Sequence, residues 1–426
     1  MEENKPFTYC SSSSSSSNSG NPRRQDAMEN LWRVSRCYPT STLEEAFNNI
    51  RIYPEYNCIS YNNLHQQQGF RRSYPSLNYN LFNSNAECDC FMCKSLFDLA
   101  VAPKTTKILQ RFIENVHQSY LKHLFRAFVN KIEEMMSQPL ANLITQSLIE
   151  RFTAEQIDYA LHEICAKGFL HRICINTYGR KTLEKLLERI SDPQVINDLT
   201  NALKPSVLRL VDSDEGRNFI LFCLRNFSDK GNKPILEVVA QNCTFIGGSI
   251  KGCTVLSQII NNVPDPINNG SEWMNHMLVI QAIAQNAKRL AYDQFGNYPM
   301  QSLLGRRNPY INTIILNQLK GEFYQLSSNK FGSNVVEKCL LMVTQRDQLD
   351  HIITELLSKS GISSLFLNEY GNYVMQTALK VSKEWMPLQH LYLLQSLREN
   401  QHIIWNTRYR KHLRQWLPRT TMQRML

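Results

Sequence analysis

A five-residue pattern recurs eight times along this 426-residue chain, and this recurrence limits the fold more than any other feature of the sequence. Each copy has a small or polar residue, a second polar or aromatic residue, two mostly apolar residues and a final polar residue. Neighbouring copies start 35 to 44 residues apart, and a glycine precedes six of them. The copies start at residues 106, 141, 180, 217, 253, 297, 333 and 372. Such a period is typical of stacked helical repeats, so we expect an all-α solenoid.

Each copy is predicted to begin a helix. In the seventh copy the apolar pairs Val335–Val336 and Leu340–Leu341 recur with nearly the period of an α-helix, which places them on one side of it. Apolar segments upstream of the copies, such as 349–357, predict a partner helix. A unit of two helices cannot cover its own apolar stripe, so we expect neighbouring units to stack.

The chain divides into two domains. Residues 1–85 are rich in Ser, Asn and Gln and include the run Ser11–Ser17. We expect this tail to be disordered, because it cannot bury enough apolar area to offset the entropy of ordering. Residues 86–420 hold the repeats, and 390–420 are predicted to form a C-terminal cap. The 44-residue interval between the fifth and sixth copies predicts a loop insertion.

The charge favours a polyanionic partner. The net charge is +10, and residues 1–97 are neutral because they hold nine basic and nine acidic side chains. The whole excess of positive charge therefore belongs to residues 98–426, where we expect a polyanion to bind.

The composition also limits the cellular compartments and the metal or cofactor chemistry that we expect for this protein. No apolar run approaches the ~18 residues of a membrane span, and the N-terminus does not resemble a signal peptide. The 12 cysteines are scattered, which favours reduced thiols. Cys88, Cys90 and Cys93 cluster without a fourth ligand, so we expect no metal site and no cofactor. We expect a cytoplasmic protein, with the nucleus or nucleolus as alternatives.

The last three copies carry a more specific signal. Their polar positions resemble, in the same order, the base-recognition triplets of the last three repeats of Pumilio (PUF) RNA-binding proteins. The triplets are Asn297-Tyr298-x-x-Gln301, Ser333-Asn334-x-x-Glu337 and Asn372-Tyr373-x-x-Gln376. The resemblance covers about 86–420 and is strongest over 290–380, so the chain looks like a divergent, plant-like member. It implies a right-handed, curved superhelix of eight Pumilio-type repeats with terminal caps.

These residue types suit base recognition. Positions i and i+4 share one face of a helix, so both side chains are expected to reach the same base edge. Asn with Gln offers amide groups that match uracil, and Glu beside Ser accepts from both N–H groups of guanine. Tyr298, Tyr373 and Asn334 supply flat faces for stacking between bases. In the family the RNA runs antiparallel to the protein, so the resemblance implies a UGU core.

The other five copies depart from the family pattern. Thr106-Lys107-x-x-Gln110 is compatible with adenine, and Cys253-Thr254 keeps a small first residue but lacks the usual Arg and Gln. Arg180 and Glu184 are spaced to form an ion pair with each other. Three further positions, Lys107, Lys181 and Arg217, are predicted mainly to attract phosphate. The fourth copy ends in Leu221, and the second, Ala141-Asn142-x-x-Thr145, has short side chains. We therefore expect sharp selectivity for UGU and loose selectivity 3′ of it.

The leading hypothesis is a monomeric, sequence-specific single-stranded RNA-binding protein that acts on messenger RNA. The resemblance implies control of translation and mRNA stability through 3′ untranslated regions, with deadenylation or translation-repression factors as partners. The alternative is a divergent scaffold or a sequence-nonspecific RNA-binding protein in ribosome assembly. An enzyme is the last choice, because the sequence offers no Gly-rich phosphate loop and no paired catalytic carboxylates.

Overall fold

The computed structural model describes residues 91–190, 192–263, 274–358, 362–405 and 410–416. All regular structure in these ranges is helical, which confirms the all-α prediction. None of the helices described there is long and apolar enough to cross a bilayer. The predicted tail, the cysteines Cys88 and Cys90, and most of the predicted loop insertion lie outside the described residues.

The chain separates into two compact units, Met1–Lys131 and Ile132–Leu426. The described part of the first unit contains α3 (Phe91–Val101), α4 (Pro103–Asn115) and α5 (Gln118–Asn130). Helix α3 packs on both α4 and α5. The first copy of the pattern lies in α4, whose apolar face is buried in this small core.

The second unit is built from repeats of three helices, not the two expected from the sequence. The additional helix has five or six residues, which is too short to show a helical period. The short helices are α6 (Ile132–Ser137), α9 (Leu170–Ile175), α12 (Val207–Asp212), α15 (Cys243–Gly247), α18 (Ala287–Tyr292), α21 (Phe323–Ser327) and α24 (Ile362–Leu367).

Each short helix precedes a longer one that carries a copy of the pattern, which we call a pattern helix. In this unit the pattern helices are α7 (Pro139–Arg151), α10 (Thr177–Leu187), α13 (Asp214–Asn226), α16 (Ile250–Asn262), α19 (Asn297–Gly305), α22 (Gly332–Met342) and α25 (Gly371–Trp385). The third helix of each set follows the pattern helix. These outer helices are α8 (Ala154–Ala166), α11 (Pro193–Leu203), α14 (Asp229–Gln241), α17 (Met274–Gln285), α20 (Pro309–Leu319), α23 (Arg346–Ser358) and α26 (Pro387–Glu399).

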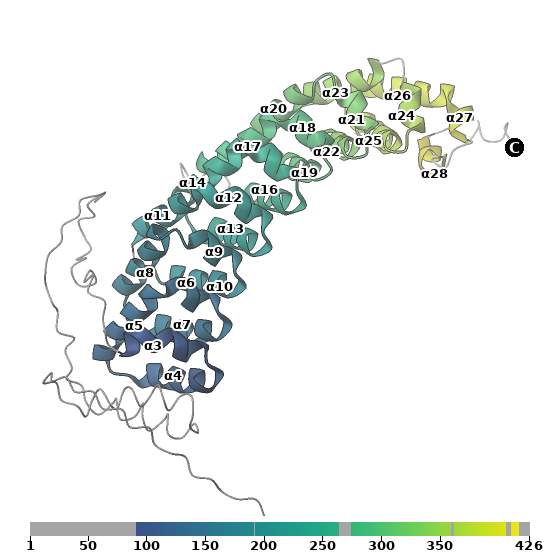
Figure 1. The fold of residues 1–426 in the computed structure, drawn as a ribbon. Helices are drawn as coiled ribbons and strands as arrows, with labels where there is room; N and C mark the ends of the chain where they lie inside the picture. Colours follow the sequence, from purple (N-terminus) through teal and green to yellow (C-terminus); the bar gives the residue numbers. More distant parts are fainter. Residues whose placement is uncertain (1–90, 191, 264–273, 359–361, 406–409, 417–426) are drawn as a thin grey trace, which may run out of the picture. The chain divides into compact units, whose positions relative to one another are not determined.

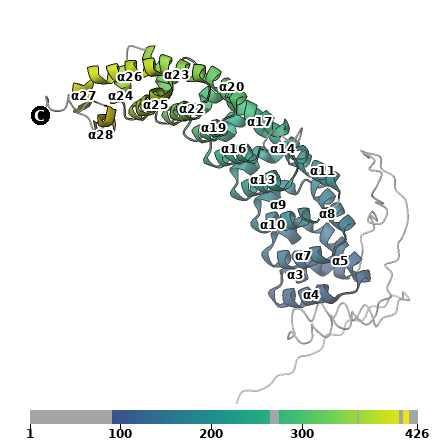
Figure 2. The ribbon, with the colours of Figure 1, turned by 180° about the vertical axis from the view of Figure 1, so that it is seen from behind.

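Equivalent helices of neighbouring repeats stack on one another. The pattern helices from α7 to α25 contact each other in sequence order, and so do the outer helices from α8 to α20 (Figures 1 and 2). Each short helix packs on the pattern helix that follows it. Leu256, Ile259 and Ile260 of α16 are fully buried, so each layer covers the apolar face of the next. After α26 the described chain ends in α27 (Gln401–Trp405), α28 (Arg410–Leu413) and a 3₁₀ turn, η3 (Arg414–Trp416).

The glycine before six of the copies is required by a close approach of two helices. A Cβ atom at that position would lie less than 3 Å from the carbonyl oxygen of the residue six positions earlier, in the preceding short helix. The six glycines are Gly179, Gly216, Gly252, Gly296, Gly332 and Gly371. In the first copy Thr105 takes this place, and its hydroxyl donates to the carbonyl of Leu99, six residues earlier.

The junction around residues 264–273 is held by two side chains. Arg306 donates to the carbonyl oxygens of Ile260 (3.1 Å) and Val263 (2.9 Å) at the end of α16. Asp229, at the start of α14, accepts the backbone N–H of Asn275 (3.0 Å) and that of His276 (3.1 Å) at the start of α17. These bonds satisfy groups that a helix end leaves unpaired.

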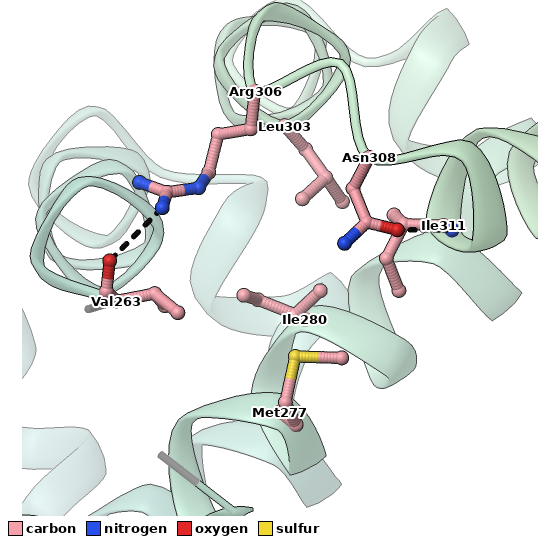
Figure 3. A pocket seen from close by; sticks show the side chains of 7 residues that line it. All are labelled: Val263, Met277, Ile280, Leu303, Arg306, Asn308 and Ile311. Carbon is pink, nitrogen blue, oxygen red and sulfur yellow. Dashed lines mark hydrogen bonds between the residues drawn. The ribbon is translucent and has the colours of Figure 1, made fainter. Parts of the chain in front are cut away.

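A cavity of about 30 Å³ lies beside Arg306 (Figure 3). Figure 3 shows the apolar side chains of Leu303, Ile280 and Met277 around it. The volume accommodates about one water molecule, and ligand pockets are at least about tenfold larger. We therefore assign this cavity to packing between repeats and look for the functional site on the pattern helices.

Candidate nucleic-acid interface

The pattern helices of the last three copies share one distribution of exposure. The first residue of the sixth, seventh and eighth copies is buried, the second is exposed, the next two are buried and the fifth is half-buried. Tyr298 is 56% exposed and Tyr373 is 47% exposed. The second and fifth residues of successive copies therefore form a row on the surface of stacked helices.

The first residues lie deeper than the sequence analysis expected. Asn372 is 0% exposed, and its amide donates to the carbonyl oxygens of Asn368 (2.9 Å) and Glu369 (3.0 Å). Its Oδ1 accepts from Nε2 of Gln376 at 3.2 Å. The prediction that the tip of this asparagine lies open beside the glutamine is wrong for this conformation, because the turn before the helix uses its N–H groups.

The sixth copy has the same arrangement. Asn297 is 2% exposed, and its amide donates to the carbonyl oxygens of Asp293 and Gln294, both at 3.0 Å. Its Oδ1 accepts from Nε2 of Gln301 at 2.9 Å. The asparagine thus fixes the orientation of the glutamine. The second N–H of the glutamine amide and its Oε1 can then pair with a donor and an acceptor on one base edge, as uracil offers.

The turn before each of these helices is also held in place. Oδ1 of Asp293 accepts the N–H groups of Phe295 and Gly296, both at 2.7 Å. Asn329 and Asn368 make the same pair of bonds before the seventh and eighth copies. These bonds fix the conformation of the short loop before each helix, and with it the position of the exposed second residue.

The seventh copy presents a carboxylate instead of an amide. Ser333 is 4% exposed, so it also lies deeper than expected, and Glu337 is half-buried. The hydroxyl of Thr377, from the next pattern helix, donates to Oε2 of Glu337 at 3.3 Å. Burial raises the pKa of the Glu337 carboxyl, and the bond from Thr377 opposes this rise. An ionised carboxylate here can accept two parallel N–H groups, which among the bases only guanine offers on one edge.

Comparison with known proteins identifies the origin of this pattern. The profile of the Pumilio-family RNA binding repeat matches residues 131–165, 322–357 and 367–385. Pumilio homolog 11 of Arabidopsis thaliana is 32% identical over 278 residues, which are 65% of this chain and 48% of that protein. The chain belongs to the Pumilio family. Pumilio homolog 12 of the same plant is 28% identical over 323 residues, 76% of this chain and 52% of that protein. The chain thus spans about half the length of the curated Pumilio relatives it matches.

Solved structures agree on the Pumilio fold. The Puf4 RNA binding domain, solved bound to the 3′ UTR recognition sequence of HO endonuclease RNA, has a TM-score of 0.59 and 25% identity. The match covers 75% of this chain and 98% of that domain. The RNA-binding domain of yeast Puf5p, solved with AAT2 RNA, has a TM-score of 0.64 and 23% identity, over 75% and 94% of the two chains. These likenesses confirm the solenoid of Pumilio repeats.

The second Pumilio repeat has a different register from the one predicted. The sequence pattern predicts that this copy starts at Ala141, but the order of buried and exposed residues shows that it starts at Asn142. Asn142 is 2% exposed, its amide donates to the carbonyl of Met136 at 2.8 Å, and its Oδ1 accepts from Nε2 of Gln146 at 2.7 Å. Leu143 is the exposed second residue. The bond from Gln146 to the buried asparagine therefore repeats that of the sixth and eighth copies, while the Asn142 amide also donates to the carbonyl of Tyr178 (3.1 Å) in the next repeat.

Sequence reasoning missed Gln146 because the usual glycine is absent. Ala141 stands at the glycine position, and an alanine fits the pattern's small first residue equally well. The Asn-x-x-x-Gln spacing that the second copy shares with the sixth and eighth was the available signal.

The first and fifth Pumilio repeats use their small first residues internally. Thr106 is buried and its hydroxyl donates to the carbonyl oxygens of Ala100 (3.1 Å) and Ala102 (2.9 Å), while Lys107 is exposed and Gln110 half-buried. Cys253 is also buried, and its thiol donates to the carbonyl of Ile250 at 3.2 Å. Thr254 is exposed, and its hydroxyl donates to the carbonyl of Lys251 at 2.6 Å. Among the described residues no group of three or more metal-binding side chains is present.

Proposed function

We propose that this protein binds single-stranded RNA sequence-specifically, with a UGU element as the core of its target. One observation carries the proposal: Gln301, Glu337 and Gln376 occupy the same half-buried place on three consecutive pattern helices, each beside an exposed flat side chain. The relatives solved as RNA complexes support the same class of ligand. The antiparallel direction known for the family assigns U to Gln376, G to Glu337 and U to Gln301, as nucleotides one to three.

The RNA series that tests this proposal changes the three UGU nucleotides one at a time at fixed ionic strength. Stacking and a bidentate edge contact each contribute about 1–3 kcal/mol, so each change is expected to weaken binding by about tenfold or more. Equal binding of all variants would instead support the alternative, a sequence-nonspecific RNA-binding protein or scaffold. Salt concentration must be stated, because phosphate contacts depend on it.

The second repeat extends the proposed element. With one nucleotide per repeat, the Asn142–Gln146 pair faces nucleotide seven, and its glutamine is held by the same bond from Nε2 to the asparagine Oδ1 as in the two uracil-type pairs. We predict a preference for uracil there, and about tenfold weaker binding of the U-containing RNA by Gln146→Ala. Gln258→Ala is the matched control, because Gln258 makes the same type of bond to an asparagine four residues away but is not a fifth residue of a copy. A flat base preference at nucleotide seven would contradict the prediction.

The raised pKa of Glu337 predicts a pH-dependent selectivity. A protonated carboxyl loses one acceptor and presents an O–H to guanine, so preference for G over A should be greatest at pH values well above the raised pKa of Glu337. It should fall as the pH drops through the raised pKa, at a higher pH than for a solvent-exposed glutamate. Fluorescence anisotropy with RNAs carrying G or A at nucleotide two, between about pH 7.5 and about pH 5, measures the ratio.

Thr377→Val removes the bond that opposes the rise in the pKa of Glu337, so the loss of guanine preference should begin at a higher pH in this variant. Preference for uracil at nucleotide one, which depends on the neutral amide of Gln376, should stay constant over the same range. A guanine preference that does not change with pH in either protein would show that Glu337 does not accept the base.

The cellular role is proposed on the same basis. A UGU-selective protein without chemistry of its own would act on mRNA 3′ untranslated regions in the cytoplasm and regulate translation and mRNA stability. Deadenylation or translation-repression factors are the partners that such a role requires. Crosslinking of the tagged protein in cells, followed by sequencing of the bound RNA, tests this role; recovery of ribosomal RNA precursors instead of 3′ untranslated regions would favour ribosome assembly.

A further inference from the structure

The third repeat has an arginine where the seventh has a serine. Arg180, the first residue of its copy, has a side chain that is 13% exposed. Its Nε lies 2.5 Å from Oε2 of Glu215, and one of its terminal nitrogens lies 2.5 Å from Oε1 of Glu184. Glu184 is the fifth residue of the same copy, so the predicted pair forms. Glu215 belongs to the next repeat, and its part in the cluster is not evident from the spacing within one copy.

Glu215 is itself held in place. It lies in the first turn of α13, where the helix N-terminus favours negative charge, and its Oε1 accepts from the hydroxyl of Thr177 at 3.0 Å. The bond from Arg180 holds the pKa of the Glu215 carboxyl below its usual value. Glu215 therefore keeps its negative charge at neutral pH, and the cluster of Arg180, Glu184 and Glu215 joins α10 to α13.

The cluster occupies the position that a base edge would use. Glu184 corresponds to Glu337 of the seventh repeat, but Oε1 of Glu184 already accepts from Arg180. Arg180 in turn directs Nε and one terminal nitrogen at two carboxylates, and its largely buried side chain cannot turn these donors to a base without breaking both contacts. In the fourth repeat Arg217 faces Asp214 at 3.6 Å, and Leu221 offers no hydrogen bond.

We propose that the Arg180–Glu184–Glu215 cluster closes the third repeat to base recognition, so that nucleotide six of the bound RNA is accepted whatever its base. This inference rests on the proposed function and deepens it. The target then has the form UGU, a three-nucleotide segment with weak base selection, and U. Arg180 is the residue that sets this property, because its removal leaves Glu184 in the same arrangement as Glu337 beside Ser333.

The test is the variant Arg180→Ser, measured with four RNAs that differ only at nucleotide six. The unchanged protein should bind all four within about twofold, whereas Arg180→Ser should prefer G by about tenfold. Lys181→Ala is the matched control: it removes one positive charge from the same helix and leaves the hydrogen bonds of the cluster in place. It should weaken all four RNAs equally and reduce the dependence of affinity on salt.

A second variant keeps the inference testable if Arg180→Ser does not fold. Arg180→Asn with Glu184→Gln copies the pair of the sixth repeat and should create a preference for U at nucleotide six; thermal melting followed by circular dichroism verifies that both variants fold. Strong base selection at nucleotide six by the unchanged protein, or flat selection by both folded variants, would overturn the inference. Loss of UGU selectivity in the unchanged protein would instead overturn the proposed function, so the two failures are distinguishable.

Discussion

Ser333→Asn combined with Glu337→Gln should change the preferred base at nucleotide two from guanine to uracil. The double variant replaces the carboxylate by an amide and supplies an asparagine beneath it, as in the sixth repeat, where Asn297 orients Gln301. Guanine loses the acceptor for its two N–H groups, and uracil gains an amide that complements it. One bidentate contact discriminates by about 1–3 kcal/mol. The double variant loses such a contact to guanine and gains one to uracil, so the two effects add in the ratio. The ratio of affinities for UGU and UUU should therefore change by about 100-fold or more.

The ratio of the affinities for UGU and UUU distinguishes a change of specificity from partial unfolding. Partial unfolding of the double variant lowers the affinity for UGU and UUU alike, whereas a change of specificity lowers one and raises the other. Glu337→Gln alone lacks the orienting asparagine and should lose guanine preference with a smaller gain for uracil. If the double variant still prefers UGU, then Glu337 is not the residue that selects nucleotide two.

Gly252→Ala should destabilise the second unit by about 3 kcal/mol. A Cβ atom at Gly252 would lie 2.0 Å from the carbonyl oxygen of Ile246 and 2.7 Å from its carbonyl carbon. Both atoms belong to the backbone, so α15 and α16 must move apart and disturb the packing of the fifth repeat. The gain in helix propensity from Gly to Ala, about 1 kcal/mol, does not offset this overlap. Urea denaturation followed by circular dichroism measures the change in the free energy of unfolding.

Gly248→Ala is the matched control for this prediction. Gly248 lies four residues earlier, and a Cβ atom there would have its nearest neighbour at 3.4 Å, the carbonyl oxygen of Thr244. Its substitution should change the free energy of unfolding by about 0.5 kcal/mol or less. Equal effects of the two substitutions would mean that the close approach of α15 and α16 does not determine the glycine.

The repeat period and the triplets can be predicted from the sequence, but the extent to which each side chain is buried cannot. The helices that carry Gln301, Glu337 and Gln376 follow from apolar spacing, because that spacing is set by the same burial that stacks the repeats. The burial of Asn297 and Asn372 could not be predicted, since it depends on carbonyl groups of the preceding turn that bond their amides. Propensity and periodicity contain no information about such a turn.

The missed features have physical causes of the same kind. The short helix α18 has six residues and less than two turns, so no period can emerge from it. The register of the second repeat was lost because Ala141 occupies a place that elsewhere needs glycine, and only the buried Asn142 fixes it. Glu215 lies 35 residues from Arg180, and only the stacking of α10 on α13 brings the two together.

The contacts of Arg306 and Asp229 have a practical consequence for protein engineering. They attach the end of α16 to the loop after α19 and the start of α17 to α14, so on either side of residues 264–273 the fifth repeat is bonded to the sixth and to the fourth. Side-chain bonds to the neighbouring repeats therefore hold α16 and α17 independently of the covalent connection between Val263 and Met274. A fluorescent or affinity module spliced into that connection should leave the triplets of α19, α22 and α25 in place, and would provide a probe of the protein that does not use either terminus.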